Sequence, residues 1–361
     1  MSRRCPRCKS VYAGEARFCP KDGSPLVDVG RSAGGKVVQA PKPVSLDSGT
    51  QVRQATPKTR GFGLDRAGSL ADQVIDSRYQ VLRKLGEGGM AMVYEAREVS
   101  TGQFVAIKVL SPKLSKDPSS VERLRREAGL AMRLNHPNAC KILRLGETED
   151  GLIYLVMPFL DGELLSDREA TIGPVDLDLG VEWMVQSCAG LHHAHQLNIV
   201  HRDLKPENIM IVKGEGDGEI AVVMDFGLAK ESKTDPGVAK LTATGIILGT
   251  PEFMSPEQIR GKDLDARSDV YALGIVAFEL FTGKLPFQGR TPQEMMISRL
   301  RGKPTPARKF RAEFPAPLEA VLMKALETEP DKRYATTLEF GHAMVDALKT
   351  DDKARLKRML A

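Results

Sequence analysis

The sequence predicts an α+β fold with two lobes, a small antiparallel sheet carrying one helix and a larger, mainly helical lobe. Alternating apolar patterns with Gly-rich turns come first along the chain, and patterns of helical period dominate after residue 175. Strands and helices that are segregated in this order favour two separate lobes. Ligands commonly bind at the junction between such lobes.

Ahead of both lobes, the chain begins with a spacing typical of a zinc ribbon. Cys5 and Cys8 form one knuckle, and Cys19 with Asp22 forms a second in which aspartate replaces the fourth cysteine. A carboxylate oxygen is an accepted zinc ligand, so these four residues predict a Zn²⁺ site, with water as the alternative fourth ligand. Because residues 1–27 contain almost no apolar core, the metal would organise this ribbon-like module.

Residues 28–72 are poor in large apolar side chains and predict a flexible, basic linker. The net charge of +5 is concentrated at this end, since residues 1–63 hold twelve Lys or Arg against four Asp or Glu. Few aromatic residues accompany these charges. Nucleic-acid binding is therefore not expected, and a solvated tail is favoured.

The apolar runs of the chain are far shorter than the about 20 residues that cross a membrane, and the basic N-terminus lacks the apolar region of a signal peptide. A cytoplasmic location follows as the prediction. In a reducing compartment the crowded N-terminal cysteines indicate metal binding. Cys140 and Cys188, in apolar surroundings, are interpreted as core residues.

The small lobe is predicted from strands over 79–86, 92–98 and 104–110, with a Gly-rich turn between the first two. A helix over 119–134 follows, with an apolar stripe made of Val121, Leu124, Ala128, Ala131 and Leu134. Glu127 falls inside that stripe, and Lys108 lies in an apolar strand. Each buried charge needs a partner, so we expect Lys108 and Glu127 to pair.

The whole domain is predicted over residues 73–349. Its larger lobe contains a hairpin of strands over 209–212 and 220–224. Its two ends lie side by side, so Asn208 and Asp225 should converge, and two oxygen ligands at one place suit Mg²⁺. Asp203 lies upstream on the same loop, where it can accept a proton. Helical patterns lie over 177–197, before the hairpin, and over 268–283 and 316–327, after it. Residues 350–361 are predicted as a short basic tail that ends the last helix.

The segments "LGEGGMAMVYEA", "VAIK", "HRDLKPEN", "DFG" and "SPE" occur in this order, and from about Tyr79 to Asp346 the chain resembles a eukaryotic-type Ser/Thr protein kinase domain of the kind that bacteria also carry. The resemblance implies catalytic roles for Asp203, Lys205, Lys108 and Glu127, with Asn208 and Asp225 as Mg²⁺ ligands. It implies an ATP site made of Gly86, Glu87, Gly88, Gly89, Val93, Ala106, Lys108, Met157, Pro158 and Leu160. It also implies that Asp269 braces the catalytic loop and that Glu257 and Arg333 form a buried ion pair.

By the same resemblance the substrates are proteins, and Lys205 is typical of kinases that phosphorylate Ser or Thr. Thr242 and Thr244 match sites of phosphorylation in trans, which implies a transient dimer, and Thr250 matches the threonine that faces the substrate. Arg202 is suited to pair with a phosphate on this loop.

Three positions depart from the usual kinase pattern. Ala91 replaces the third glycine, Ser255 replaces alanine, and Pro158 takes the hinge place usually held by Glu. Proline loses only its N–H, so adenine can still bond to the backbone there.

The alternatives to an active kinase are a pseudokinase scaffold, which should lack Lys108, Asp203 or Asp225, and a nucleic-acid-binding ribbon with an appended kinase. The cluster His192, His193 and His195 is interpreted as packed or exposed histidines and not as a metal site.

Overall fold

The computed structural model describes residues 2–4, 11–13, 27–28, 70–88, 91–111, 118–149, 151–216, 218–226, 251–289 and 291–360. The chain divides into two compact units, Met1–Thr59 and Arg60–Ala361. In the first unit three short strands pair in the order β2-β1-β3, with bounds Ser2–Arg4 (β1), Val11–Ala13 (β2) and Val27–Asp28 (β3). The predicted zinc ligands Cys5, Cys8, Cys19 and Asp22 lie outside the described residues.

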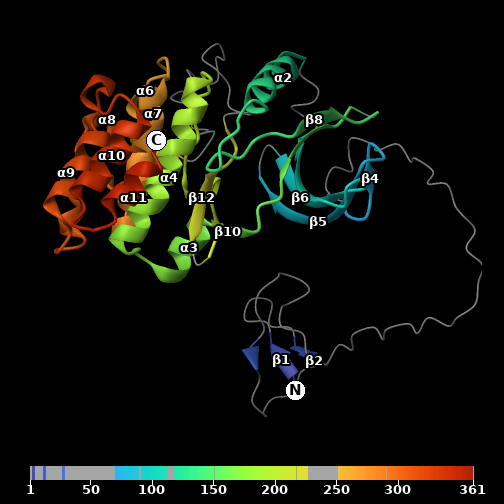
Figure 1. Ribbon diagram of the computed structural model, residues 1–361, viewed down its shortest axis with the longest axis horizontal. Helices are drawn as coiled ribbons and strands as arrows, with labels where there is room; N and C mark the ends of the chain where they lie inside the picture. Colours follow the sequence, from blue (N-terminus) through green and yellow to red (C-terminus); the bar gives the residue numbers. More distant parts are fainter. Residues whose placement is uncertain are drawn as a thin grey trace, which may run out of the picture. The chain divides into compact units, whose positions relative to one another are not determined.

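The second unit begins with an antiparallel sheet in the strand order β4-β5-β6-β7-β9-β8 (Figure 1). The three predicted strands are confirmed as β5 (Tyr79–Glu87), β6 (Ala91–Glu98) and β7 (Phe104–Leu110). The other strands, which the sequence analysis did not predict, are β4 (Val74–Ile75), β8 (Arg144–Glu147) and β9 (Ile153–Pro158).

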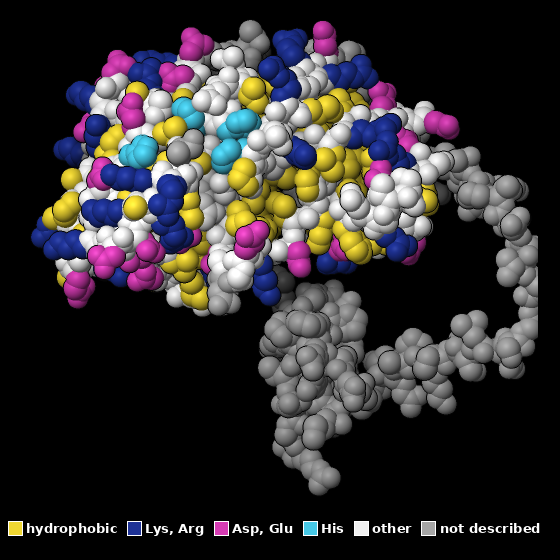
Figure 2. All heavy atoms as spheres, in the orientation of Figure 1, with side chains coloured by type: hydrophobic (Ala, Val, Ile, Leu, Met, Phe, Trp, Pro, Cys, Tyr) yellow, Lys and Arg dark blue, Asp and Glu magenta, His cyan; other side chains and the backbone are white. Residues whose placement is uncertain are grey.

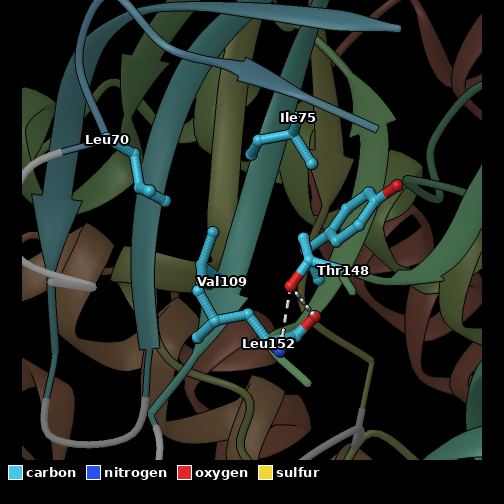
Figure 3. A pocket seen from close by; sticks show the side chains of 6 residues that line it. Leu70, Ile75, Val109, Thr148 and Leu152 are labelled. Atoms are coloured by element: carbon cyan, nitrogen blue, oxygen red, sulfur yellow. Dashed lines mark hydrogen bonds between the residues drawn. The ribbon is translucent and has the colours of Figure 1, made fainter. Parts of the chain in front are cut away.

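One face of this sheet is covered by the chain that precedes it. Leu70 and Ile75, at 1% and 2% exposure, belong to a core with Val109 and Tyr154. Together with Thr148 and Leu152 these side chains line a cavity of about 10 Å³, shown in Figure 3. The domain therefore includes Leu70, which lies before the boundary predicted at residue 73, because this buried side chain is part of its core.

The predicted helix is confirmed as α2 (Pro118–Ala131), and it packs on the opposite face of the sheet. Its buried side chains Leu124, Ala128 and Ala131 share a core with Leu110 and Leu155. Leu110 alternates with Val109 along β7, so the two cores lie on opposite faces of the strand. Lys108, two residues from Leu110, points to the α2 side.

The large lobe is mainly helical, as predicted. Its helices are α3 (Leu165–Ile172), α4 (Leu177–Gln196), α6 (Pro256–Ile259), α7 (Ala266–Thr282), α8 (Pro292–Arg301), α9 (Ala316–Ala325), α10 (Thr337–Ala347) and α11 (Lys353–Arg358). Helix α7 lies at the centre of the lobe, since all its residues except Ala266, Arg267 and Glu279 are buried. Among the described helices, none is long and apolar enough to span a membrane.

The last helix corrects the expectation for the C-terminal tail. Helix α10 ends at Ala347 and Leu348 is extended, so α11 is a separate helix and not the end of α10. Leu356 and Leu360 are buried at 1% and 4% exposure in the core of the large lobe. Burial of these two leucines folds the segment back onto the domain.

The predicted hairpin is confirmed in a second small sheet. Strands β11 (Ile209–Lys213) and β12 (Glu219–Val223) pair with Ile209 opposite Val223, and β10 (Gly162–Leu164) joins β11 on its other edge. A Cβ at Gly162 would lie 2.4 Å from the carbonyl oxygen of Ile211, so glycine allows β10 to approach. The two open ends of the hairpin lie beside residues 201–205, which the resemblance identifies as the catalytic loop.

Candidate active site

The two ends of the β11–β12 hairpin converge as the sequence analysis expected. The N–H of Met224 donates to the C=O of Asn208 over 2.8 Å, which places Asp225 beside the turn Pro206–Asn208 (η2). The Asn208 Nδ2 donates to the C=O of Asp203 over 2.7 Å. This bond uses the amide donor of Asn208, and the amide oxygen together with the Asp225 carboxylate is a donor set that suits Mg²⁺.

The backbone of the catalytic loop is held by Asp269, which is 1% exposed. Its carboxylate accepts hydrogen bonds from the N–H groups of His201 (2.8 Å) and Arg202 (3.1 Å). Burial raises the pKa of Asp269, but the contacts with His195 and His201 together outweigh it and hold the pKa below its ordinary value. Asp269 is therefore charged at neutral pH and braces the loop, as the resemblance implied.

The ring of His201 connects the loop to the hairpin. Its Nε2 lies 2.7 Å from the C=O of Met224, to which it donates, and its Nδ1 accepts from the N–H of Asp203 over 3.3 Å. The ring also packs against the buried Phe226, with centroids 5.1 Å apart. These contacts fix the backbone of Asp203 relative to Asp225.

Lys108 has a different partner from the one expected. Its Nζ lies 2.8 Å from Asp225 Oδ1, whereas Glu127 Oε1 lies 4.0 Å from Arg202 Nη1. The prediction that Glu127 holds Lys108 is thus wrong for this structure, because Asp225 and Arg202 are the opposite charges within reach. Burial raises the pKa of Glu127, and Arg202 offsets part of that rise. Burial also raises the pKa of Asp225, but Lys108, with smaller contributions from His201 and Lys205, outweighs it and the pKa is lowered.

Lys205 lies near the carboxylate that the resemblance assigns to catalysis. Its Nζ is 4.0 Å from Asp203 Oδ2, and the two side chains are 21% and 28% exposed. A reacting group can therefore reach both side chains from solvent. The structure brings Lys108, Asp203, Lys205, Asn208 and Asp225 to one end of the hairpin.

The residues assigned to ATP lie on neighbouring strands. Gly86 and Glu87 end β5 opposite Val93 and Met92 of β6, and the N–H of Gly88 donates to the C=O of Ala91 over 2.9 Å. Val93 of β6 is paired with Lys108 of β7, and Ala106 of β7 is paired with Met157 of β9. Pro158 ends β9 and Leu160 follows it. Gly89 lies outside the described residues, as do Thr242, Thr244 and Thr250.

The expected ion pair of the large lobe is formed. Arg333 donates two hydrogen bonds of 2.7 Å to the carboxylate of Glu257 on α6. Burial raises the pKa of Glu257, but Arg333 outweighs it, so the pKa is lowered and the pair is charged. This pair anchors the start of α6.

The three histidines of α4 have separate partners. His195 Nε2 lies 2.7 Å from Asp269, His193 Nε2 accepts from the N–H of Asn135, and His192 Nε2 lies 3.2 Å from Gln196. Histidine side chains appear at the surface of the large lobe in Figure 2. Over the residues that the structure describes, no group of three or more His, Cys, Asp or Glu could hold a metal ion.

Sequence reasoning missed two residues near the site. Gln258 bridges α6 and the catalytic loop, and Arg299 of α8 donates to the C=O of Glu252 in the turn Pro251–Phe253 (η4). The pattern Ser255-Pro-Glu-Gln258 is a capping-box signature that could have identified Gln258. Nothing in the sequence around Arg299 distinguishes it from the exposed arginines of the chain.

This geometry defines the class of protein. The chain belongs to the protein kinase family, since residues 79–345 match the sequence pattern described as protein kinase domain. More particularly, it is similar to bacterial serine/threonine-protein kinases. It is 41% identical over 270 residues to the serine/threonine-protein kinase PknB of Mycolicibacterium smegmatis (74% of this chain, 42% of that protein). It is 38% identical over 271 residues to pkn3 of Myxococcus xanthus (74% and 49%).

A third relative is the serine/threonine-protein kinase PrkC of Bacillus subtilis, 39% identical over 277 residues, which are 77% of this chain and 41% of that protein. The chain thus spans less than half the length of these curated relatives. Among solved structures it is similar to the PknI kinase domain of Mycobacterium tuberculosis, with a TM-score of 0.62, 29% identity, and coverage of 78% of this chain and 100% of that chain. These likenesses confirm the two-lobed kinase fold.

Proposed function

We propose that this protein is a serine/threonine protein kinase that transfers the γ-phosphate of ATP to hydroxyl groups of protein substrates. The observation that carries the proposal is the convergence of Asp203, Lys205, Asn208, Asp225 and Lys108 at the open end of the hairpin. The named activities of the bacterial relatives support it. The presence of Lys108, Asp203 and Asp225 argues against a pseudokinase scaffold.

In this proposal Asp203 orients the acceptor hydroxyl and takes its proton, while Lys205 and Lys108 offset the charge of the transferred phosphate. Asn208 and Asp225 would hold Mg²⁺, which when bound supplies positive charge at the phosphate oxygens. Adenine would bond to the backbone C=O of Pro158 and the N–H of Leu160. The protein thus contributes mainly positioning and electrostatic stabilisation.

The charge pairs of the structure imply a rearrangement before transfer. Lys108 now pairs with Asp225, and Glu127 lies near Arg202. Lys108 must leave Asp225 in order to contact the phosphates, and Glu127 must leave Arg202 in order to hold Lys108. A phosphate at Thr242 or Thr244 would attract Arg202 and so release Glu127, which is how we propose that autophosphorylation activates the enzyme. A transient dimer would allow the reaction in trans.

We propose that the N-terminal module binds Zn²⁺ through Cys5, Cys8, Cys19 and Asp22. It would serve the kinase as a docking or sensing module. The ligand spacing supports this part of the proposal. Residues 28–72 would act as a tether between it and the kinase domain. A cytoplasmic location also stays a prediction.

The proposed activity is tested by incubating the purified full chain with Mg-ATP labelled at the γ-phosphate and a generic basic protein. We expect label on serine or threonine of the chain itself or of the added protein. Label on tyrosine alone would contradict the assignment of the acceptor.

A further inference from the structure

The side chain of Gln258 on α6 makes two hydrogen bonds to two different segments. Its Oε1 accepts from the N–H of Ser255 over 2.8 Å, which forms half of the capping box at the start of α6. Its Nε2 donates to the C=O of Arg202 over 2.6 Å. The amide orientation follows from the chemistry, because only the oxygen can accept from an N–H and only the nitrogen can donate to a carbonyl.

The carbonyl that Gln258 contacts belongs to the peptide group directly before Asp203. Arg202 has a φ of 65°, a left-handed conformation that is strained for a residue other than glycine. Such a conformation persists only where surrounding contacts fix it. The N–H of Arg202 is held by Asp269, and the peptide between Arg202 and Asp203 is held at its oxygen by Gln258 and at its N–H by His201.

Gln258 is itself fixed on a rigid support. The preceding residue, Glu257, is 4% exposed and accepts two hydrogen bonds from Arg333 and one of 2.6 Å from Ser268. The Oγ of Ser255 accepts from the N–H of Gln258 over 3.4 Å and completes the capping box. The start of α6 is thus anchored independently of the bond from Gln258 to the catalytic loop.

We propose that Gln258 is a positioning residue for phosphoryl transfer: its amide nitrogen holds the Arg202–Asp203 peptide, and so orients the Asp203 carboxylate toward the acceptor hydroxyl. The proposal rests on the kinase function proposed above. It also connects α6 to the loop that carries Asp203, since one side-chain amide bonds to both the Ser255 N–H and the Arg202 carbonyl.

Two variants separate the two hydrogen bonds of Gln258. Gln258→Glu has nearly the same shape and can still accept from Ser255 N–H, but its carboxylate cannot donate to the Arg202 carbonyl. We expect kcat to fall about tenfold or more with the KM for ATP and the melting temperature little changed. Gln258→Lys can donate to that carbonyl but cannot accept from Ser255. It should lower the melting temperature while keeping most of kcat.

The pH dependence provides a readout that a purely structural role would not change. As pH falls and the introduced carboxyl of Gln258→Glu takes up a proton, it can donate to the carbonyl again. The ratio of variant to wild-type kcat should therefore rise toward low pH. Gln288→Glu is the matched control, because the exposed Gln288 also donates to a backbone carbonyl, that of Leu285, over 2.8 Å. It should keep wild-type kcat at every pH.

Wild-type kcat in Gln258→Glu would overturn the proposal. So would a ratio that does not change with pH, or a joint loss of stability and activity in both variants, since each outcome makes the residue purely structural. These results are distinguishable from failure of the proposed function, in which the wild-type chain itself would transfer no phosphate.

Discussion

In the large lobe, Glu169 of α3 is influenced by two other carboxylates, Glu279 of α7 and Glu207 of η2. Burial, followed by the charges of Glu279 and Glu207, raises the pKa of Glu169 to about 8. Burial and Glu207 raise the pKa of Glu279 to about 7. The Glu169 Oε1 is buried and has no hydrogen-bond partner among the residues that the structure describes. At the residue scale, the protonation of Glu169 therefore makes the free energy of unfolding depend on pH.

In the folded protein Glu169 keeps its proton up to about pH 8, whereas its ordinary pKa is 4.5. The folded state therefore binds more protons between these values, and stability falls as pH rises across this interval. Glu169→Gln stays neutral, so its melting temperature should exceed that of the wild type by a margin that grows up to about pH 8 and then levels off. Glu149→Gln, at an exposed position, is the control, and a margin independent of pH would contradict the assignment.

At the residue scale, the partners of Lys108 and Glu127 could be predicted from the sequence only in part. The apolar surroundings of Lys108 and the apolar stripe around Glu127 correctly indicated that each charge needs a partner. They did not indicate which partner, because a stripe fixes the face of α2 and not its distance from β7. That distance decides between Lys108 and Arg202 as the neighbour of Glu127.

At the scale of elements, two buried arginines anchor the segments around α6. Arg333 donates to the Glu257 carboxylate and to the carbonyls of Arg267, Glu327 and Thr328. Arg299 is also buried, at 1% exposure, but its Nε and Nη1 have no hydrogen-bond partner within the described part of the chain. Its Nη2 donates to the Glu252 carbonyl, and its guanidinium lies 5.7 Å from the ring centroid of Phe287.

Replacing each arginine by methionine should therefore have unequal effects. Arg333→Met leaves the Glu257 carboxylate buried without its cation, so we expect a loss of about 3–5 kcal/mol in the free energy of unfolding. Arg299→Met removes a poorly paired cation, and the loss should be about 1 kcal/mol or less. Denaturant unfolding of the purified chain measures both values, and equal losses would contradict this account.

Residues 228–254, which we propose as the activation loop by their resemblance to kinases, carry a second prediction at this scale. If phosphate on Thr242 or Thr244 draws Arg202 away from Glu127, the Thr242→Ala/Thr244→Ala double variant should have much lower kinase activity than the wild type. Thr→Ala at the exposed Thr101 serves as the control. Wild-type activity in the double variant would refute activation by phosphorylation there.

Long elements were predictable because their apolar periodicity extends over many residues, as in α4, α7 and the strand that carries Lys108. The hairpin was predictable from its Gly-rich turn, and with it the convergence of Asn208 and Asp225. The bridge from Gln258 to Arg202 was not, because it joins residues 56 positions apart through a side chain whose local pattern indicates only a helix cap. The separate helix α11 was missed because burial of Leu356 and Leu360 is a tertiary effect.

At the scale of the whole molecule, the chain combines a kinase domain with a small N-terminal unit. The ligand spacing predicts about one zinc ion per chain, which Cys5→Ser should abolish. Metal analysis of the purified chain tests this, with Cys140→Ser as a control that should retain the metal. A zinc-free wild-type chain whose N-terminal unit is nevertheless folded would contradict the prediction.

The central claim is that Asp203 serves phosphoryl transfer from ATP to a protein hydroxyl. The most direct measurement compares the wild type with Asp203→Asn for transfer of labelled γ-phosphate in the presence of Mg²⁺, with nucleotide binding measured alongside. The account predicts that Asp203→Asn binds ATP like the wild type but loses nearly all transfer. Equal transfer by the two proteins, or no transfer by the wild type under any condition, would contradict it.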